Sequence, residues 1–361
     1  MPSLTIPTEP VGSIPRPPEL ISAVRAHERG EIDRAVLEAL YDDAIADTLQ
    51  RFEATGSPVI SDGEQRKYHN FATYCVHGAP NLAPDGFKLQ FVDHYRQWPR
   101  LTAGPFRYVH RGEDYLAHAL EHSRCAVKQA VISPSALSLF YPPQELPGYP
   151  RDLFIADLVE QCESEIRACL ALGATTVQVD FTEGRLAHKL DPSGALLESF
   201  IELNNMALRR FSDEERRRIG IHTCPGGDCD STHSADVDYA LLLPSLFELQ
   251  ASKFFIALAR EPDRRRVLAL IGQHLKPWQT AYIGVIDPLD PHIDTPEEVC
   301  ERVLEAAEYI PLQQLGTTDD CGFAPFSDDI STSRDTAFAK IRARVLGTRL
   351  ASERLSARSG L

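Results

Sequence analysis

The stretch from Leu153 to Asp180 decides the fold. Its first part, Leu153–Leu172, has the periodicity of a helix, and the apolar run Thr176-Val177-Gln178-Val179-Asp180 follows. A parallel strand that is buried on both faces reads as a nearly continuous apolar run, as this one does. The same alternation recurs through the 361 residues. Eight runs are therefore predicted to be strands, at residues 10–13, 58–62, 128–133, 176–180, 219–222, 254–258, 281–287 and 312–316.

Eight alternating strand and helix units predict an α/β fold of the (β/α)₈, or TIM barrel, class. Further helical periodicity lies at 296–309 and 334–346. The length suits one barrel with loop insertions, so residues 1–361 are predicted to form a single domain. A doubly wound open sheet is the alternative. The chain has no Gly-x-Gly-x-x-Gly after the first run and no phosphate-binding loop, so nucleotide binding has little support.

The composition is that of an ordinary globular protein, with 43% hydrophobic and 25% charged residues. A net charge of -15 argues against nucleic acid or an anionic membrane surface as a partner. The sequence has no apolar run of about 18 residues, and its first residues lack the features of a signal peptide. The eight cysteines have no regular spacing, which favours reduced thiols over a disulfide framework. These features predict a cytoplasmic protein.

A candidate metal site appears where two predicted strands give way to loops. His222-Thr-Cys224 ends the fifth predicted strand, and Cys321 follows the eighth. In a barrel, the ends of all strands meet at one mouth, so these residues are expected to converge. Imidazole and thiolate donors suit Zn²⁺, and an open position on such an ion could bind a substrate thiol as its thiolate. A buried histidine with two inert thiols is the alternative interpretation.

Other polar residues end the remaining strands. Asp180 and Glu64 are predicted to be catalytic and to bind substrate, because a carboxylate buried at a strand end needs a partner. Ser13 and Asp287 are predicted to bind substrate as well. Asp320 could hold His222 by a hydrogen bond, which would make it part of the catalytic group, or it could cap a loop. Glu64 could instead be a loop carboxylate that pairs with a neighbouring cation.

Five segments in this order resemble one family, the cobalamin-independent methionine synthases, in their C-terminal catalytic barrel. The likeness covers nearly the whole chain. The segments are Val11-Gly-Ser-Ile-Pro-Arg16, Asp62-Gly-Glu-Gln-Arg66, Val177-Gln-Val-Asp180, His222-Thr-Cys224 and Asp320-Cys-Gly322. The resemblance implies that His222, Cys224 and Cys321 hold zinc, and that the zinc binds the thiol of homocysteine. It also implies that the resulting thiolate takes a methyl group from a folate.

Two departures from the family pattern concern the site. The family has Asp-Glu-Pro-Ala after the fourth strand, whereas this chain has Asp180-Phe-Thr-Glu-Gly184. The family's fourth protein zinc ligand is a Glu after the sixth strand, and Ala257 falls at that place. The zinc would then keep three protein ligands, or another donor would replace the Glu. The candidate replacements are Asp228, Cys229, Asp230 and His233, with Glu248 a weaker one.

The sequence thus predicts a zinc-dependent thiol alkyltransferase, with methyl transfer to homocysteine as the leading reaction. A folate, a corrinoid or an epoxide would supply the alkyl group, with or without a partner protein. One alternative resembles the epoxyalkane:coenzyme M transferases and acts on another thiol or thioether. A second is a metal-free barrel that resembles uroporphyrinogen decarboxylase. A third is a non-catalytic protein that binds zinc or thiols.

Overall fold

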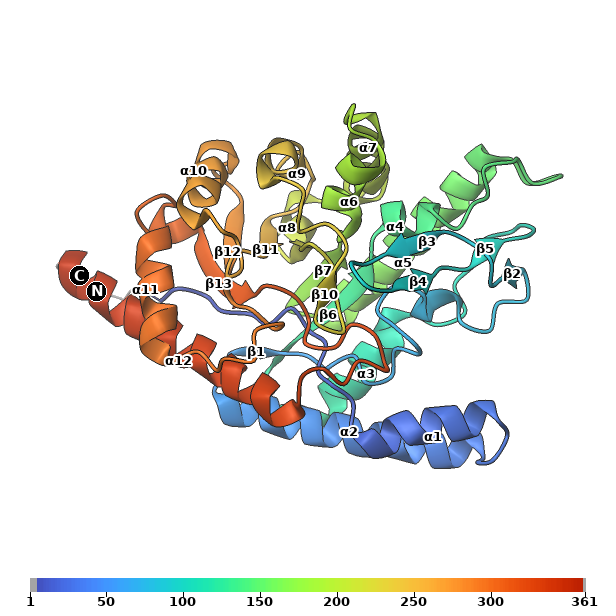
Figure 1. Ribbon diagram of the computed structural model, residues 1–361, viewed down its shortest axis with the longest axis horizontal. Helices are drawn as coiled ribbons and strands as arrows, with labels where there is room; N and C mark the ends of the chain where they lie inside the picture. Colours follow the sequence, from blue (N-terminus) through green and yellow to red (C-terminus); the bar gives the residue numbers. More distant parts are fainter. Residues whose placement is uncertain (1–4, 360–361) are drawn as a thin grey trace.

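Seven of the eight predicted runs form strands of one parallel sheet. The computed structural model describes residues 5–359, and its main sheet curls around a buried interior (Figure 1). The strand order is β1-β6-β7-β8-β11-β12-β13, and every pairing is parallel. The strands are β1 (Val59–Ile60), β6 (Ala126–Ile132), β7 (Thr176–Asp180), β8 (Ile219–Thr223), β11 (Lys253–Ile256), β12 (Thr280–Ile286) and β13 (Leu315–Asp319).

The predicted strand at 10–13 is wrong. The chain on either side of this segment contacts the two ends of the sheet. The Glu9 N–H donates to the Thr317 carbonyl oxygen of β13 (3.1 Å), and the Ile14 N–H donates to the Gly63 carbonyl oxygen beyond β1 (3.0 Å). Around this segment, the only ladder contact in the described part of the chain is an isolated bridge between Thr8 and Thr317. Pro7 and Pro10 supply no N–H groups, so a continuous ladder cannot form there. The observed fold is a seven-stranded curled α/β sheet close to a TIM barrel.

The last predicted strand begins later than expected. Residues Leu312–Gln314 form a 3₁₀ turn, η3, after Pro311, and β13 then runs from Leu315 to Asp319. The shift moves the strand's end to Asp319, so Asp320 and Cys321 stand directly at the mouth of the sheet. The prediction of a strand that ends near these residues is thereby confirmed, but the strand begins and ends three residues later than predicted.

Helices cover the outer face of the sheet (Figure 1). The predicted helical segments at 153–172, 296–309 and 334–346 are confirmed as α5, α11 and α12. Helices α2 and α12, from opposite ends of the chain, pack against each other. The helices are α1 (Pro18–Glu28), α2 (Arg34–Thr55), α3 (Gly112–His122), α4 (Pro134–Ser138), α5 (Arg151–Leu172), α6 (Glu183–Leu190), α7 (Ala195–Leu208), α8 (Asp213–Arg216), α9 (Leu243–Leu246), α10 (Arg264–His274), α11 (Pro296–Ala306) and α12 (Arg334–Ser359). In the described residues, no helix combines the length and apolarity that crossing a bilayer requires.

Short hairpins stand on the carboxyl ends of the parallel strands. Between β1 and α3 lie η1 (Tyr74–Val76), β2 (Leu82–Ala83), β3 (Lys88–Gln90), β4 (Tyr95–Gln97) and β5 (Arg100–Leu101). After β8 lie β9 (Gly227–Asp228), β10 (Ser231–Thr232) and η2 (Tyr239–Leu241). Arg96 in β4 joins the two regions, because its guanidinium donates to both oxygens of Asp228 at 2.5 and 2.8 Å. It also pairs with Asp328, beyond β13 (3.0 Å). One arginine thereby ties three loops together.

Glu165, in α5, is a buried carboxylate. Its burial raises its pKa to about 7. Its Oε1 accepts hydrogen bonds from the Tyr74 hydroxyl (2.9 Å) and the Gly112 N–H (2.7 Å), while Oε2 has no partner. In the unfolded chain such a group titrates near 4.5. The folded state therefore binds the proton more tightly. The resulting stabilisation is complete below pH 4.5 and is lost as the pH rises toward 7.

Replacement of Glu165 by glutamine is expected to flatten the pH dependence of the free energy of unfolding. Between about pH 5 and 8, the unmodified protein should lose roughly 2–3 kcal/mol relative to the variant, since one pKa unit is worth about 1.4 kcal/mol. Urea unfolding at both pH values measures this difference. The exposed Glu145→Gln is the control, and parallel pH profiles for the unmodified protein and Glu165→Gln would contradict the prediction.

Candidate metal centre

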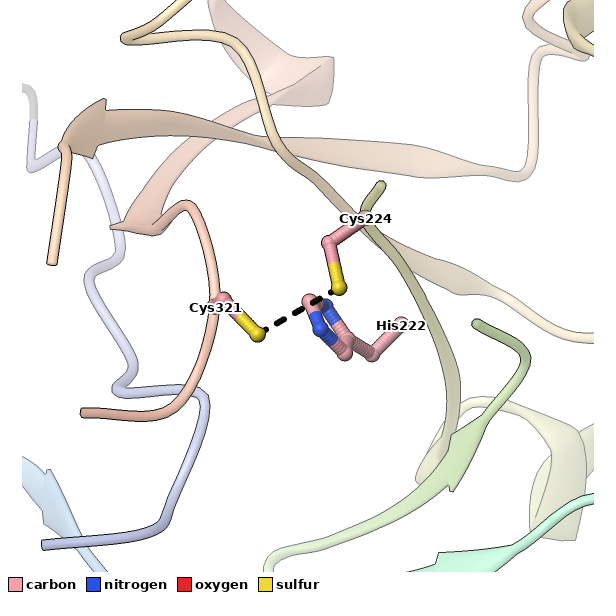
Figure 2. A group of neighbouring side chains, drawn as sticks. All are labelled: His222, Cys224 and Cys321. Atoms are coloured by element: carbon pink, nitrogen blue, oxygen red, sulfur yellow. Dashed lines mark hydrogen bonds between the residues drawn. The ribbon is translucent and has the colours of Figure 1, made fainter. Parts of the chain in front are cut away.

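The three predicted metal ligands converge at the mouth of the sheet. His222 lies in β8, Cys224 follows the end of that strand, and Cys321 lies two residues beyond β13. One ligand atom from each residue lies within 4.8 Å of the others, and the two Sγ atoms are 3.3 Å apart. Figure 2 shows the two sulfurs directed toward each other beside the imidazole ring. The predicted convergence of these three side chains is what the structure contains.

The donor set fits a zinc ion. The Nδ1 atom of His222 lies 3.3 Å from the carbonyl oxygen of Phe255 in β11, so it carries the proton of the neutral ring and donates it there. The Nε2 atom then carries a lone pair, and it is buried with no hydrogen-bond partner. Two sulfurs bound to one tetrahedral zinc lie about 3.8 Å apart, given Zn–S bonds of about 2.3 Å. The observed separation needs only a small adjustment to reach that geometry.

The two thiols differ in acidity. The hydrogen bond from the Cys224 thiol holds the pKa of Cys321 well below its ordinary value, against the opposing effect of burial. The same hydrogen bond, together with burial, raises the pKa of Cys224 well above its ordinary value. Cys321 is therefore the more acidic of the two thiols and the one that more readily becomes a thiolate. Such a thiolate is a good ligand for a soft cation.

No fourth ligand accompanies these three in the described residues. Ala257 is buried beside the site, where its N–H donates to the carbonyl oxygen of Thr223 (3.1 Å), but its side chain cannot bind a metal. The metal-ligand cluster at this place contains no other His, Cys, Asp or Glu within 4.8 Å. A site with three protein ligands and an open position is typical of catalytic zinc.

The candidate replacements for the missing Glu have other partners or lie elsewhere. Asp228 is fully buried against Arg96 and His94. Cys229 is exposed and turned toward Asp228, and Glu248 forms an ion pair with Lys276 (2.8 Å). Asp230 lies in the exposed turn between β9 and β10. His233 does line the pocket, with a buried and unpartnered Nδ1, and its burial lowers its pKa to about 3.

Three of the predicted substrate-binding residues line the same pocket as the metal ligands. Ser13, Glu64 and Asp180 form part of the wall of this pocket. The Glu64 carboxylate lies 3.3 Å from the buried ammonium of Lys67, which is the pairing that the sequence left open. Ser13 Oγ accepts a hydrogen bond from the Ala324 N–H (3.3 Å). Since that hydroxyl still has its own proton, it can donate to a substrate.

Asp180 is supported from below by two residues that the sequence analysis missed. Gln178 Nε2 donates to Asp180 Oδ1 (2.7 Å), and Lys128 Nζ donates to Gln178 Oε1 (2.8 Å). The ammonium can only donate, so it fixes which end of the amide faces the carboxylate. Burial raises the pKa of Asp180 to about 6, although His222 opposes the rise. Residues 178 and 180 alternate onto the same face of β7, and this spacing was the available signal.

Asp320 and Asp287 do not line this pocket. The Asp320 carboxylate accepts the backbone N–H groups of Leu258 (2.8 Å), Ala259 (2.7 Å) and Arg260 (3.0 Å). It thus caps the loop after β11 and makes no bond to His222. Asp287 accepts the Leu289 N–H (2.9 Å) and lies 3.5 Å from Arg260. Their proposed roles in catalysis and substrate binding therefore stay predictions.

Close packing around Asp320 requires a glycine on the neighbouring strand. A Cβ atom on Gly284 in β12 would lie 1.8 Å from Asp320 Oδ1 and 2.8 Å from the Leu258 nitrogen. Neither atom can move without breaking the loop cap. Position 284 must therefore be glycine for the Asp320 carboxylate to hold the loop after β11.

Similarity to known proteins covers almost the whole chain. Over 355 residues it is 24% identical to a methionine synthase from Sulfurisphaera tokodaii, with 97% of this chain and 94% of that protein aligned. It is also 24% identical over 359 residues to a methionine synthase from Sulfolobus acidocaldarius, with 97% and 93% aligned. The chain is therefore similar to methionine synthases over almost its whole length. No protein-family model matches it.

Solved structures of methionine synthases share the fold. A B12-independent methionine synthase from Shewanella sp. W3-18-1, in complex with selenomethionine, superposes with a TM-score of 0.77 at 17% identity, covering 98% of this chain and 99% of that one. A putative vitamin-B12 independent methionine synthase from Listeria monocytogenes gives a TM-score of 0.68 at 21% identity, with the same coverage. The resemblance to the cobalamin-independent methionine synthases that the sequence motifs indicated is thereby confirmed.

Proposed function

We propose that this protein transfers a methyl group to the sulfur of homocysteine, giving methionine, at a zinc ion held by His222, Cys224 and Cys321. The observation that carries this proposal is the convergence of one unpartnered imidazole nitrogen and two sulfurs 3.3 Å apart in a pocket. The similarity to methionine synthases over 97% of the chain supports the choice of homocysteine. The selenomethionine complex of the Shewanella structure gives the same indication.

The protein's own side chains would orient the amino-acid substrate. Zinc, when bound, supplies a Lewis acid that keeps a substrate thiol deprotonated at neutral pH. Asp180, held through one oxygen by Gln178, presents its other oxygen to the substrate ammonium, and Glu64 offers a second carboxylate. The Ser13 hydroxyl can donate to the substrate carboxylate. The buried side chains around the pocket exclude water, which strengthens each of these contacts.

The second substrate is a small-molecule alkyl donor. The sequence resemblance names a folate, a corrinoid or an epoxide for this role. Alkylation of a thiol other than homocysteine is the alternative reaction, and Ala257 in place of a family ligand is the observation that favours it. Both reactions need the same metal and the same activated sulfur, so the identity of the thiol is what separates them.

X-ray absorption at the zinc edge tests the proposal. The purified protein is expected to contain one zinc per chain with two sulfur ligands, and to gain a third sulfur when homocysteine is added. The hydroxyl analogue homoserine is the control and should leave the sulfur count unchanged. Mercaptoethanol, a thiol without the amino-acid groups, should bind at least about tenfold more weakly, since one lost charged hydrogen bond costs about 1.5–3 kcal/mol. Absence of zinc, or a shell that homocysteine does not change, would refute the proposal.

A further inference from the structure

A second group of metal-ligand side chains lies on the outer layer of helices. His118, Glu121 and His122 occupy the end of α3, and one ligand atom from each lies within 4.8 Å of the others. Residues three and four apart are neighbours on a helix surface. The two imidazole rings accordingly lie side by side, with centroids 4.6 Å apart and planes inclined by 35°. Small rotations of these side chains would give the bonds of about 2.0–2.2 Å that zinc makes with nitrogen and oxygen.

Each histidine has one ring nitrogen beside an acceptor and the other left over. The Nδ1 atom of His122 lies 2.9 Å from the carbonyl oxygen of His118, so it carries the proton of the neutral ring and donates it there. Its Nε2 atom then carries the lone pair. The Nε2 atom of His118 lies 3.2 Å from Oδ1 of Asp42 in α2, which leaves Nδ1 for a ligand. Histidines that bind metals are held in this way, by a carbonyl or a carboxylate beside the nitrogen away from the ion.

The charges around these residues permit a bound cation. Burial lowers the pKa of His118, and Arg66 lowers it further, so the ring is neutral at pH 7 and keeps its lone pair. The charge of Arg66 is offset, because the guanidinium pairs with both Glu38 and Asp42. The exposed Glu121 adds a negative charge on the outer side. A cation at the end of α3 would therefore meet no uncompensated positive charge from Arg66.

Two other clusters outside the mouth of the sheet have their ligand atoms occupied. Both oxygens of Asp228 accept hydrogen bonds from Arg96. In the other cluster, Asp294 pairs with Arg302, and Glu298 accepts the N–H and the hydroxyl of the residue before α11. Of the clusters found among residues 5–359, the one on α3 is thus the one outside the mouth whose donors are available to an ion.

We propose that His118, Glu121 and His122 form a second metal site, for a divalent transition-metal ion such as Zn²⁺ or Ni²⁺, and that Asp42 supports it from α2. Imidazole ligands suit these ions, whereas Mg²⁺ and Ca²⁺ take oxygen ligands. The site is structural, because three residues separate His122 from the start of β6 at Ala126. It therefore lies at the amino edge of the sheet, opposite the mouth. A bound ion would tie α3 to α2, and this inference does not depend on the proposed function.

Calorimetry with Ni²⁺ on the zinc-loaded protein tests for the site. The protein is expected to bind one further ion per chain, while elemental analysis still finds its zinc. His122→Ala should weaken Ni²⁺ binding at least about tenfold, because even residues that only support a ligand contribute about 10–100-fold to metal affinity. His274→Ala is the matched control, since His274 also ends a helix, α10, but has Leu270 four residues before it. Equal Ni²⁺ affinity in the unmodified protein and His122→Ala would overturn the proposal.

A second pair of variants tests the link to α2. Asp42→Asn should weaken Ni²⁺ binding about tenfold. Asp43→Asn removes the same charge from the neighbouring exposed position and should stay within about twofold, since solvent screens a charge that does not touch the site. Ni²⁺ should also raise the midpoint of thermal unfolding of the unmodified protein but not of His122→Ala, because the unfolded chain does not hold the two imidazoles one turn apart. Equal Ni²⁺ affinity in Asp42→Asn and Asp43→Asn would overturn the supporting role of Asp42.

Discussion

Replacement of Cys321 by serine is expected to abolish zinc retention and, with it, methyl transfer. The serine hydroxyl is a hard donor that stays protonated at neutral pH, so it replaces neither the charge nor the softness of the thiolate. Among residues 5–359, three protein ligands gather at this site, and the alanine at position 257 cannot replace a lost one. Loss of residues that merely support ligands costs about 10–100-fold in metal affinity, so loss of a ligand should cost more than about 100-fold.

The measurement is zinc content after dialysis against a weak chelator, followed by a homocysteine methylation assay. Cys229→Ser is the matched control, because this cysteine lies in the loop just after Cys224 but is exposed and outside the ligand cluster. It is expected to keep one zinc per chain and full activity. Thermal unfolding of both variants shows whether the fold is intact. Full zinc occupancy in Cys321→Ser, or equal loss in Cys229→Ser, would show that the ligand assignment is wrong.

The metal ligands could be predicted from sequence because their positions depend on which strands they follow and on the curl of a barrel-like sheet. In a parallel sheet every residue that follows a strand stands at the same edge. Since β11 and β12 separate β8 from β13, it is the curl of the sheet that brings His222, Cys224 and Cys321 together. The register of the sheet adds the next layer. Asp180 of β7 is the neighbour of His222 in β8, and Phe255 of β11 lies on its other side. Local patterns therefore sufficed to place most of the inner pocket.

The remaining parts of the site depend on contacts between distant segments. Asp228 looked like a metal ligand in the sequence, but Arg96, 132 residues earlier, occupies both of its oxygens. Asp320 stands beside a ligand and yet caps a loop 60–62 residues away. Phe91 reaches the pocket from the hairpin of β3 and β4, which that arginine ties to Asp228. No periodicity or spacing encodes such pairings, since they depend on how loops of irregular conformation pack.

The failed first strand has a similar cause. Residues 10–13 are apolar enough to be buried, and they do lie between the two ends of the sheet. An apolar run, however, predicts only that a segment is buried. A strand also requires N–H donors along its length, and Pro7 and Pro10 lack them. Side chains replace part of the missing ladder. The Ser61 hydroxyl donates to the Gly12 carbonyl oxygen (2.8 Å), and Lys128 Nζ donates to that of Pro10 (2.7 Å).

Replacement of Lys128 by methionine is expected to destabilise the protein by about 3–5 kcal/mol, the usual cost of removing one partner from a buried ion pair. The Lys128 ammonium is fully buried, 3.6 Å from the Glu9 carboxylate and 3.7 Å from the centroid of the Phe255 ring. Burial lowers the pKa of this lysine to about 8. Without its charge, Glu9 keeps only Lys253 (2.7 Å) as a counterion, and Gln178 loses the donor that orients its amide.

Chemical unfolding of the single and double variants separates charge from packing. Glu9→Gln combined with Lys128→Met should cost less than the sum of the two single changes, because the double variant leaves neither partner as an isolated charge. Lys189→Met is the surface control, since its pair with Asp236 (3.0 Å) is largely exposed and should contribute less than about 1 kcal/mol. Strict additivity, or a loss in Lys128→Met no larger than in the surface control, would show that the ammonium does not stabilise the base of the sheet. A Lys128→Met protein that folds should also bind homocysteine more weakly, because the orientation of Asp180 depends on the hydrogen bonds that pass through Gln178.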